Sequence, residues 1–183
     1  MYKICQTEES QKRQYSIESA LLQMMVRMPY AEITVSSLCA EASIPRKTFY
    51  RYFEKKDDVL FALIDHTQML YLAAGPAGPS SFAEAERMYS FWYEHRELLD
   101  VLIKNDMEGI WYSRMIETAV GERVGARFSQ QKEDAYGYQL MTHFVIGGLL
   151  SCVLFWHRGG WHHTPGQMAE ITGKLLTEPL YNL

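Results

Sequence analysis

Cationic and aromatic side chains are interleaved in one short stretch of the chain, residues 43–56, which reads SIPRKTFYRYFEKK. Five of these fourteen residues are Lys or Arg, and four are aromatic. Cations at this density can bind the phosphates of a nucleic acid, and an Arg can also donate two hydrogen bonds to the edge of a guanine base. The stretch therefore indicates an anion-binding surface, provided that the cations face outward and the rings inward.

Helical geometry would separate the two kinds of side chain. Pro45 can begin a helix, because its fixed φ suits the first helical position, where no backbone donor is needed. At about 100° per residue, three rings then fall on one side: Phe49, Tyr52 and Phe53. Lys47 and Arg51 fall on the opposite side. We expect the rings to anchor this helix in the core and the cations to face solvent.

A shorter helix is expected just before this one, on the other side of a break at Ser43. Thr34 is a suitable N-cap for it. Apolar side chains follow at i, i+3, i+4 and i+7: Val35, Leu38, Cys39 and Ala42. Two short helices joined by a tight turn, the second with a basic outer face, form a helix-turn-helix. In that motif the second helix enters the major groove while the first lies over the DNA backbone.

Helical periodicity also dominates the rest of the chain, and no run of alternating apolar and polar residues predicts a hairpin. Further helices are expected over residues 11–28, 56–74, 81–95 and 131–157 and from residue 164, with shorter helices between 95 and 127. The GPAGPS stretch at 75–80 breaks the chain. We predict an all-α fold of about nine helices, divided near residue 55 into a helix-turn-helix domain, residues 1–55, and a second helical domain, residues 56–183.

The composition is that of a folded protein, with 48% hydrophobic, 13% aromatic and 22% charged residues in a chain of 183. Its three cysteines are far apart, which predicts neither a disulfide framework nor a cysteine metal site and favours a reducing compartment. The N-terminus lacks the apolar core of a signal peptide, and the longest apolar run, residues 144–156, is shorter than the roughly 20 residues that cross a bilayer. We therefore expect a cytoplasmic protein without a membrane partner.

Charge is distributed unevenly, although the net charge at pH 7 is only −4. Residues 1–56 carry nine Lys or Arg against six Asp or Glu, a balance of +3. Residues 57–183 carry nine against sixteen, a balance of −7. This asymmetry is consistent with an N-terminal part that meets an anion, although an imbalance of this size also occurs by chance.

Residues 33–65 read ITVSSLCAEASIPRKTFYRYFEKKDDVLFALID and resemble the N-terminal signature of the TetR family of transcription regulators. The matching features are Thr34 at the start of the first helix, the apolar core at 38–42, the block at 48–53, and Lys56 with the apolar pair that follows it. With the helix before it, the resemblance covers about a third of the chain. It implies a regulator, a repressor in our interpretation, that binds a near-palindromic DNA operator as a homodimer and is released or modulated by a small ligand.

Two positions depart from the usual pattern of the family. Ser43 stands where the family commonly has Gly in the turn, and Pro45 stands where it commonly has a capping Ser or Thr. A residue other than Gly at positive φ would cost on the order of 1 kcal/mol. Either the turn differs slightly from the family's turn, or Ser43 compensates through its hydroxyl.

The resemblance, together with the helical geometry, assigns roles to individual side chains of the helix-turn-helix. Base edges are expected to be contacted from the first turn of the second helix, by Arg46, Lys47 and Thr48. Phosphates are expected to be contacted by Tyr50, Arg51, Lys55 and Lys56 and, at the start of the first helix, by Thr34 and Ser36. Lys55 and Lys56 could also be an ordinary solvated pair of charges. Cys39, on the inward stripe, is interpreted as core packing.

The C-terminal part of TetR-family proteins holds the ligand and forms the dimer, usually through the last two long helices, and residues 144–176 look like that pair. Large, partly polar side chains are candidates for the lining of a ligand pocket: Tyr89, Trp92, Trp111, Tyr112, Met115 and His143. Aromatic and Met residues at helical spacing are also typical of a core. Nothing in the sequence identifies the small-molecule effector.

Other functions have weaker support in the sequence. His157, His162 and His163 lack a carboxylate or Cys at a recognisable ligand spacing, so we expect no metal and no cofactor. No nucleophile elbow, phosphate loop or paired-carboxylate motif indicates an enzyme, and we expect no catalytic residue. The stronger alternative is a helical regulator or co-activator that acts mainly through a protein partner. Specific retention of an operator fragment would distinguish DNA binding from that alternative.

Overall fold

The computed structural model describes residues 2, 7–75, 81–128 and 135–177, and these form nine α-helices and one 3₁₀ turn. The elements, in order, are α1 Glu8–Arg27, η1 Tyr30–Glu32, α2 Val35–Glu41, α3 Arg46–Phe49, α4 Lys56–Ala73, α5 Ser81–Glu94, α6 Arg96–Lys104, α7 Glu108–Phe128, α8 Ala135–Arg158 and α9 Pro165–Thr177. The all-α prediction is confirmed, since the described ranges contain no strand. Of the expected chain break at 75–80, only Gly75 lies within the described residues.

Side chains near the helix starts fix where the helices begin. Thr7 accepts a hydrogen bond from the backbone N–H of Ser10, so α1 begins earlier than the expected residue 11. Thr34 and Ser37 bond reciprocally at the start of α2, with both side-chain to backbone distances at 3.0 Å. This capping box confirms Thr34 as the N-cap. Thr164 caps α9 as expected, and its hydroxyl accepts from the N–H of Gln167 at 3.3 Å.

The turn between α2 and α3 closes as a Schellman motif. The N–H of Ser43 donates to the carbonyl of Ala40 at 3.1 Å, and the N–H of Ile44 donates to the carbonyl of Cys39 at 2.9 Å. Ser43 has a φ of 53° and occupies the left-handed position that Gly most often fills. The turn thus keeps the geometry for which Gly is preferred, at a cost of about 1 kcal/mol for the serine side chain.

The second helix of the motif is a single turn. Pro45 has an extended ψ of 146° and immediately precedes the helix, whereas the sequence predicted it as the first helical residue. After Phe49 the chain continues in turns, in which the N–H of Phe53 donates to the carbonyl of Phe49 at 3.0 Å. Because so short a helix cannot stand alone, it depends on the rings that anchor it in the core.

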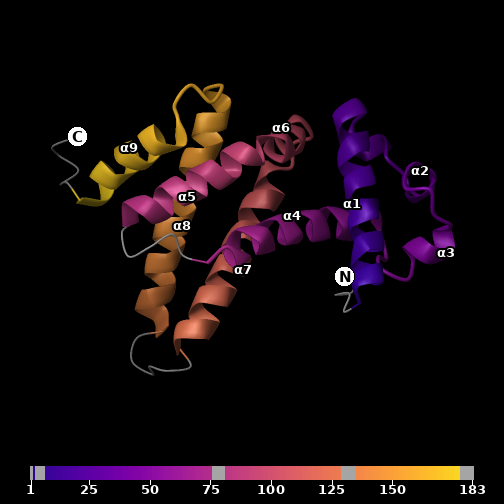
Figure 1. Ribbon diagram of the computed structural model, residues 1–183, viewed down its shortest axis with the longest axis horizontal. Coiled ribbons are helices and arrows are strands. Elements are labelled where there is room, and N and C mark those ends of the chain that lie inside the picture. The colour runs from indigo at the N-terminus through magenta and orange to yellow at the C-terminus, as the bar shows by residue number, and fades with distance from the viewer. Residues whose placement is uncertain (1, 3–6, 76–80, 129–134, 178–183) are drawn as a thin grey trace.

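α1, α2 and α3 pack around one apolar core at one side of the molecule (Figure 1). Its most buried members include Ile17, Leu21, Met25, Leu38, Phe49, Phe53 and Leu60. Phe49 and Phe53 have ring centroids 5.6 Å apart. Helices α1 and α2 and the single turn of α3 are therefore held as one unit.

α4 runs from this unit to α7 and links the two parts of the molecule (Figure 1). At its start, the carboxylate of Asp58 accepts hydrogen bonds from the N–H groups of Glu54 and Lys55, at 3.0 and 3.3 Å. Farther along α4, Asp65 accepts hydrogen bonds at both carboxylate oxygens from Arg114 of α7. α7 pairs with α8, and α5 pairs with α9.

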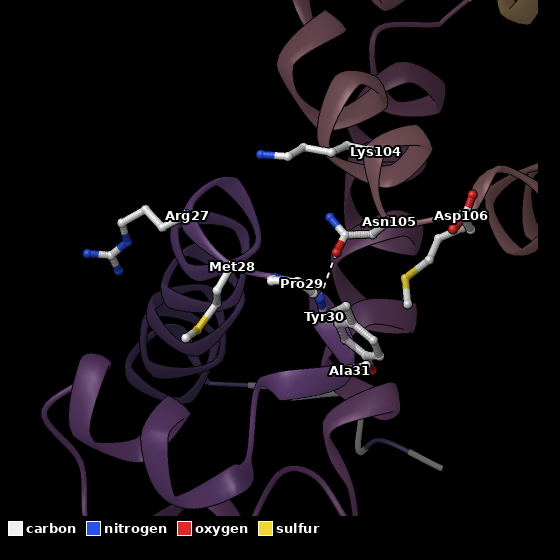
Figure 2. Close-up of a pocket in the computed structure, with 9 residues that line it drawn as sticks. Arg27, Met28, Pro29, Tyr30, Ala31, Lys104, Asn105 and Asp106 are labelled. Atoms are coloured by element: carbon white, nitrogen blue, oxygen red, sulfur yellow. Dashed lines mark hydrogen bonds between the residues drawn. The ribbon is translucent and has the colours of Figure 1, made fainter.

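The turn between α6 and α7 meets the end of α1 directly (Figure 2). The side chain of Asn105 accepts a hydrogen bond from the N–H of Tyr30 at 2.6 Å, and Lys104 donates to the carbonyl of Val26 at 3.0 Å. A groove of about 310 Å³ lies at this junction and is lined by residues 27–31 and 104–107. The helix-turn-helix is thus fixed to the second part through α4 and through this turn.

Candidate nucleic-acid interface

The outer face of α2 and α3 carries most of the polar groups that the sequence singled out. Seven of these residues are exposed: Thr34, Ser36, Arg46, Lys47, Tyr50, Arg51 and Lys55. Thr48 and Lys56 are partly buried. α2 and α3 lie at the edge of the molecule, and α1 separates them from the other helices (Figure 1). A long ligand could therefore approach this face.

The rings of the same segment take the opposite orientation. Phe49, Tyr52 and Phe53 are at most 6% exposed, whereas Tyr50 is 49% exposed. The predicted separation of rings and cations is therefore confirmed. Each buried aromatic side chain contributes roughly 2 to 3 kcal/mol to the core, which is enough to hold one helical turn with its cations in water.

Arg46 and Tyr50 form a pair on the exposed side of α3. The guanidinium of Arg46 donates to the hydroxyl oxygen of Tyr50 at 3.2 Å, and this hydrogen bond raises the pKa of Arg46. The Tyr50 ring meets the buried Phe49 ring edge-on, with centroids 5.4 Å apart. The ring of Tyr50 is thus held by Phe49, while its hydroxyl accepts from Arg46 and can orient that guanidinium.

Lys56 has a different environment from Lys55. The ammonium group of Lys56 donates to the carbonyl oxygens of Tyr30 and Ile33, at 2.6 and 2.8 Å, and lies 4.2 Å from the centroid of the Tyr30 ring. The side chain of Lys55 is 61% exposed, and its ammonium lies 3.2 Å from a carboxylate oxygen of Asp57. The donors of Lys56 therefore hold the backbone between α1 and α2, and this geometry argues against the expected phosphate contact of Lys56.

Tyr30 ties the same segment to the start of α4. Its hydroxyl donates to the carboxylate of Asp57 at 2.5 Å, and this hydrogen bond lowers the pKa of Asp57. Its ring packs against the Lys56 ammonium. Sequence reasoning missed this role of Tyr30, because an isolated Tyr after Pro29 carries no signal of its partners. These contacts fix the position of α2 relative to α4.

Cys39 lies in the core, as the sequence predicted. It is 3% exposed, and burial raises the pKa of its thiol. A neutral buried thiol is unreactive, so this residue packs against its neighbours.

The residues proposed for a ligand pocket are distributed between core and surface. Four are almost completely buried: Tyr89, Trp92, Trp111 and Met115. The rings of Trp92 and Trp111 meet edge-on with centroids 5.0 Å apart. Tyr112 is partly buried and donates to the carbonyl of Gly147 at 3.2 Å, whereas His143 is exposed on α8. The six therefore differ in burial, and their place in a ligand pocket stays a prediction.

Several buried polar atoms have no hydrogen-bond partner among the residues that the structure describes, and two of them lie where α4 packs against α7. Gln68 of α4 donates its amide to the carbonyl of Met115 at 3.0 Å, but its side-chain oxygen is buried and unpaired. The indole N–H of Trp111, one turn from Met115, is also buried and unpaired. Unpaired buried groups are costly, so this is a place where a polar atom of a ligand would be stabilised.

One face of α8 is apolar and exposed. Five large side chains form this face, which we call the α8 face: Tyr136, Leu140, Met141, Phe144 and Phe155. Phe144 is 75% exposed and Phe155 is 77% exposed. By length and composition residues 139–158 could also cross a membrane, contrary to our expectation from the sequence, and 24% of that window is buried.

No metal site is found in the ranges that the structure describes. They contain no group of three His, Cys, Asp or Glu that could hold an ion. His157 instead lies beside Asp100, with an imidazole nitrogen 2.8 Å from a carboxylate oxygen.

Comparisons with known proteins give one family and one fold. Residues 17–63 match the model of bacterial regulatory proteins of the tetR family. The fatty acid degradation regulator FadR from Bacillus halodurans has a similar structure, with a TM-score of 0.56 and 16% identity, over 97% of this chain and 98% of that one. A candidate fatty acid metabolism regulator of Clostridium perfringens has a TM-score of 0.54 and 15% identity, over 90% and 98%. No curated protein matches the sequence significantly.

Proposed function

We propose that this chain, whose residues 17–63 match the model of bacterial regulatory proteins of the tetR family, is a transcription regulator of that family. In this proposal it acts in the cytoplasm as a repressor that binds a near-palindromic DNA operator as a homodimer. A small ligand that binds among the C-terminal helices releases the protein from the operator or modulates its affinity for DNA. The observation that carries the DNA-binding part is the single turn of α3, whose rings are buried and whose cations are exposed.

The exposed side chains divide into two groups by position. Arg46, Lys47 and Thr48 occupy the first turn of α3 and are proposed to reach base edges in the major groove. Phosphate contacts are proposed for Tyr50, Arg51, Lys55, Thr34 and Ser36. Lys56 is omitted from this set, because its ammonium is taken up by backbone carbonyls.

A homodimer is supported by the α8 face. Phe144 and Phe155 expose far more apolar surface than a solvated helix needs, and one partner surface would remove both from water. Gly148 is exposed between them and would let a partner helix approach closely. The opposite side of α8 is buried through Leu150, Val153 and Trp156, so only one side of the helix is left for a partner. This one-sided burial favours a second copy of the chain over lipid, which would surround a spanning helix.

The effector is proposed to enter the aromatic core between α4, α5 and α7. The unpaired oxygen of Gln68 and the unpaired N–H of Trp111 support a ligand that has a polar group and an apolar body. To act allosterically, the ligand must bind one dimer geometry better than another. Because the two similar structures are described as regulators of fatty acid degradation and metabolism, fatty acids and their derivatives are the first compounds to test.

The DNA-binding proposal is tested with duplex fragments from the region beside the protein's own gene. We expect the wild type to retain at least one fragment, with an affinity that falls steeply as salt rises. Arg46→Ala, Lys47→Ala and Tyr50→Ala should each weaken retention at least tenfold while leaving the thermal melt unchanged.

Arg158→Ala is the matched control. This residue ends α8, on the opposite side of the molecule from α3, and is exposed. If Arg158→Ala lost as much retention as Arg46→Ala, retention would depend on the total charge of the protein and not on the position of Arg46. Failure of the wild type on every fragment would favour action through a protein partner.

A further inference from the structure

A second groove adjoins the proposed DNA interface. It has a volume of about 130 Å³ and lies between the first turns of α1 and the segment that follows α3. Its lining consists of Thr7, Glu9, Ser10, Arg13, Arg51 and Tyr52. The lower end of α1 and the segment from α3 to α4 lie side by side in Figure 1. The groove is large enough for one phosphate group.

Two arginines from separate elements meet at this groove. Arg51 is exposed and follows α3, one helical turn after Lys47, so the groove is continuous with the cationic outer face of α3. Arg13 comes from α1, and its side chain is 49% exposed. Two guanidinium groups that border one small groove create a positive potential there, and planar guanidinium groups bind phosphate oxygens well.

The remaining polar groups of the groove also suit an anion. The hydroxyl oxygens of Thr7 and Ser10 lie 2.7 Å apart at its wall. The hydroxyl of Ser10 donates to the backbone carbonyl of Thr7 at 2.8 Å. The hydroxyl of Thr7 can turn its donor from Ser10 toward a bound oxygen, because hydroxyl rotors adjust to their partners. It supplies a neutral donor next to the two cations.

Glu9 is the group that opposes an anion. Its carboxylate lies 2.7 Å from the guanidinium of Arg13, and its side chain is 79% exposed. An ion pair this exposed is weak, because water and salt screen it. A phosphate can therefore take the place of the Glu9 carboxylate at Arg13, while Glu9 turns into solvent.

We propose that this groove binds one phosphate of the operator backbone, held by Arg13 and Arg51, in addition to the phosphates contacted by α2 and α3. The proposal rests on the proposed DNA-binding function and extends the interface to α1, which sequence reasoning did not include. Each protomer of a dimer would make this contact once, so two phosphates per operator are involved.

The test compares Arg13→Gln with Lys12→Gln on an operator fragment. Lys12 is the next residue of α1, is 73% exposed in an equivalent pair with Glu8, and does not line the groove. Both variants remove one positive charge. Arg13→Gln should weaken binding about 5- to 10-fold and lower the slope of log K against log salt by about one per protomer. Lys12→Gln should change affinity by less than about twofold.

Glu9→Gln provides a result in the opposite direction. Because it removes the carboxylate that competes for Arg13, it should tighten binding about two- to fivefold. A duplex with a neutral methylphosphonate at the contacted position should bind the wild type and Arg13→Gln equally. Adding 10 mM inorganic phosphate at constant ionic strength should not reproduce the effect, since the ligand is a phosphate placed by the duplex.

The outcomes separate this inference from the proposed function. If the wild type binds a fragment and Arg13→Gln matches Lys12→Gln in affinity and salt slope, the groove proposal is wrong and the DNA-binding proposal stands. If free phosphate displaces DNA specifically through Arg13, the groove is a site for a free anion and the backbone assignment is wrong. If the wild type binds no duplex, both proposals are wrong. Circular dichroism melts of the three variants show whether each is folded.

Discussion

The outer face of α3 and the α8 face are both exposed, yet their chemistry is opposite. On α3 the rings are buried and cations reach solvent, whereas on α8 Phe144 and Phe155 are among the most exposed large hydrophobic side chains. The first surface suits a charged and hydrated ligand, and the second suits an apolar partner. The comparison indicates that the two ends of the molecule bind by different forces, so salt should weaken binding at α3 and leave association at α8 largely unchanged.

The largest effect is expected at the α8 face. Phe144→Glu replaces an aromatic ring with a charge. Burial of that ring in an interface would contribute roughly 2 to 3 kcal/mol, and a two-fold interface contains the change twice. We expect the dimer to dissociate at least 100-fold more readily and operator affinity to fall with it. Sedimentation velocity at several concentrations measures the change. Gln23→Glu, at an exposed polar position on α1, should leave the sedimentation unchanged.

If Phe144→Glu dimerised as strongly as the wild type, the α8 face would not be the dimer interface. Partition of the wild type into vesicles of neutral lipid would instead indicate that residues 139–158 meet a membrane.

A buried apolar side chain should respond quite differently from an exposed one. Trp111 is fully buried, so Trp111→Ala should lower the free energy of unfolding by about 3 to 5 kcal/mol. Leu70, which is 60% exposed on α4, should change it by less than about 0.5 kcal/mol when replaced by Ala. Denaturant unfolding measures both. Equal losses in the two variants would contradict the assignment of Trp111 to a packed core.

Neighbouring lysines offer a sharper comparison within the helix-turn-helix. Lys56→Gln removes charged hydrogen bonds to two carbonyls and should lower the free energy of unfolding by about 1 to 3 kcal/mol, without altering the salt slope of DNA binding. Lys55→Gln should do the reverse, with a salt slope lower by about one per protomer and an unchanged melt. A reduced salt slope in Lys56→Gln would mean that Lys56 does contact a phosphate.

The smallest expected effect is at the turn between α2 and α3. Ser43 adopts a φ of 53°, which Gly reaches without strain, so Ser43→Gly should stabilise the protein by up to about 1 kcal/mol. Chemical denaturation measures the change, and Ala42→Gly, one residue earlier at an ordinary φ of −74°, should destabilise instead. Stabilisation by both variants would mean that the left-handed geometry of Ser43 is not the cause.

Sequence reasoning anticipated most of the N-terminal part, because there the physics is local. The cap at Thr34, the single break at Ser43 and the spacing of Phe49, Tyr52 and Phe53 fix two helices within a few turns of one another. Lys56 was the exception. Its partners are carbonyl oxygens from a segment more than twenty residues earlier, and no local pattern predicts such a contact.

The C-terminal part was anticipated only as a set of helices. Trp111 and Phe144 are both large apolar residues at helical spacing, yet one is completely buried and the other is 75% exposed. Periodicity along one helix cannot distinguish a core from a surface that awaits a partner, because both are apolar. The groove at Arg13 and Arg51 was missed for a related reason, since its two cations come from elements that only the fold brings together.

The central claim is that a symmetric pair of protomers presents the cationic outer face of α3 twice to one duplex. Selection of bound sites from a library of random duplexes tests it most directly. We predict enrichment of an inverted repeat whose half-sites are centred about 10 base pairs, or a multiple of that, apart and which binds protomers in pairs. Enrichment of a single unrepeated half-site bound by one protomer, or no enrichment at all, would contradict the claim.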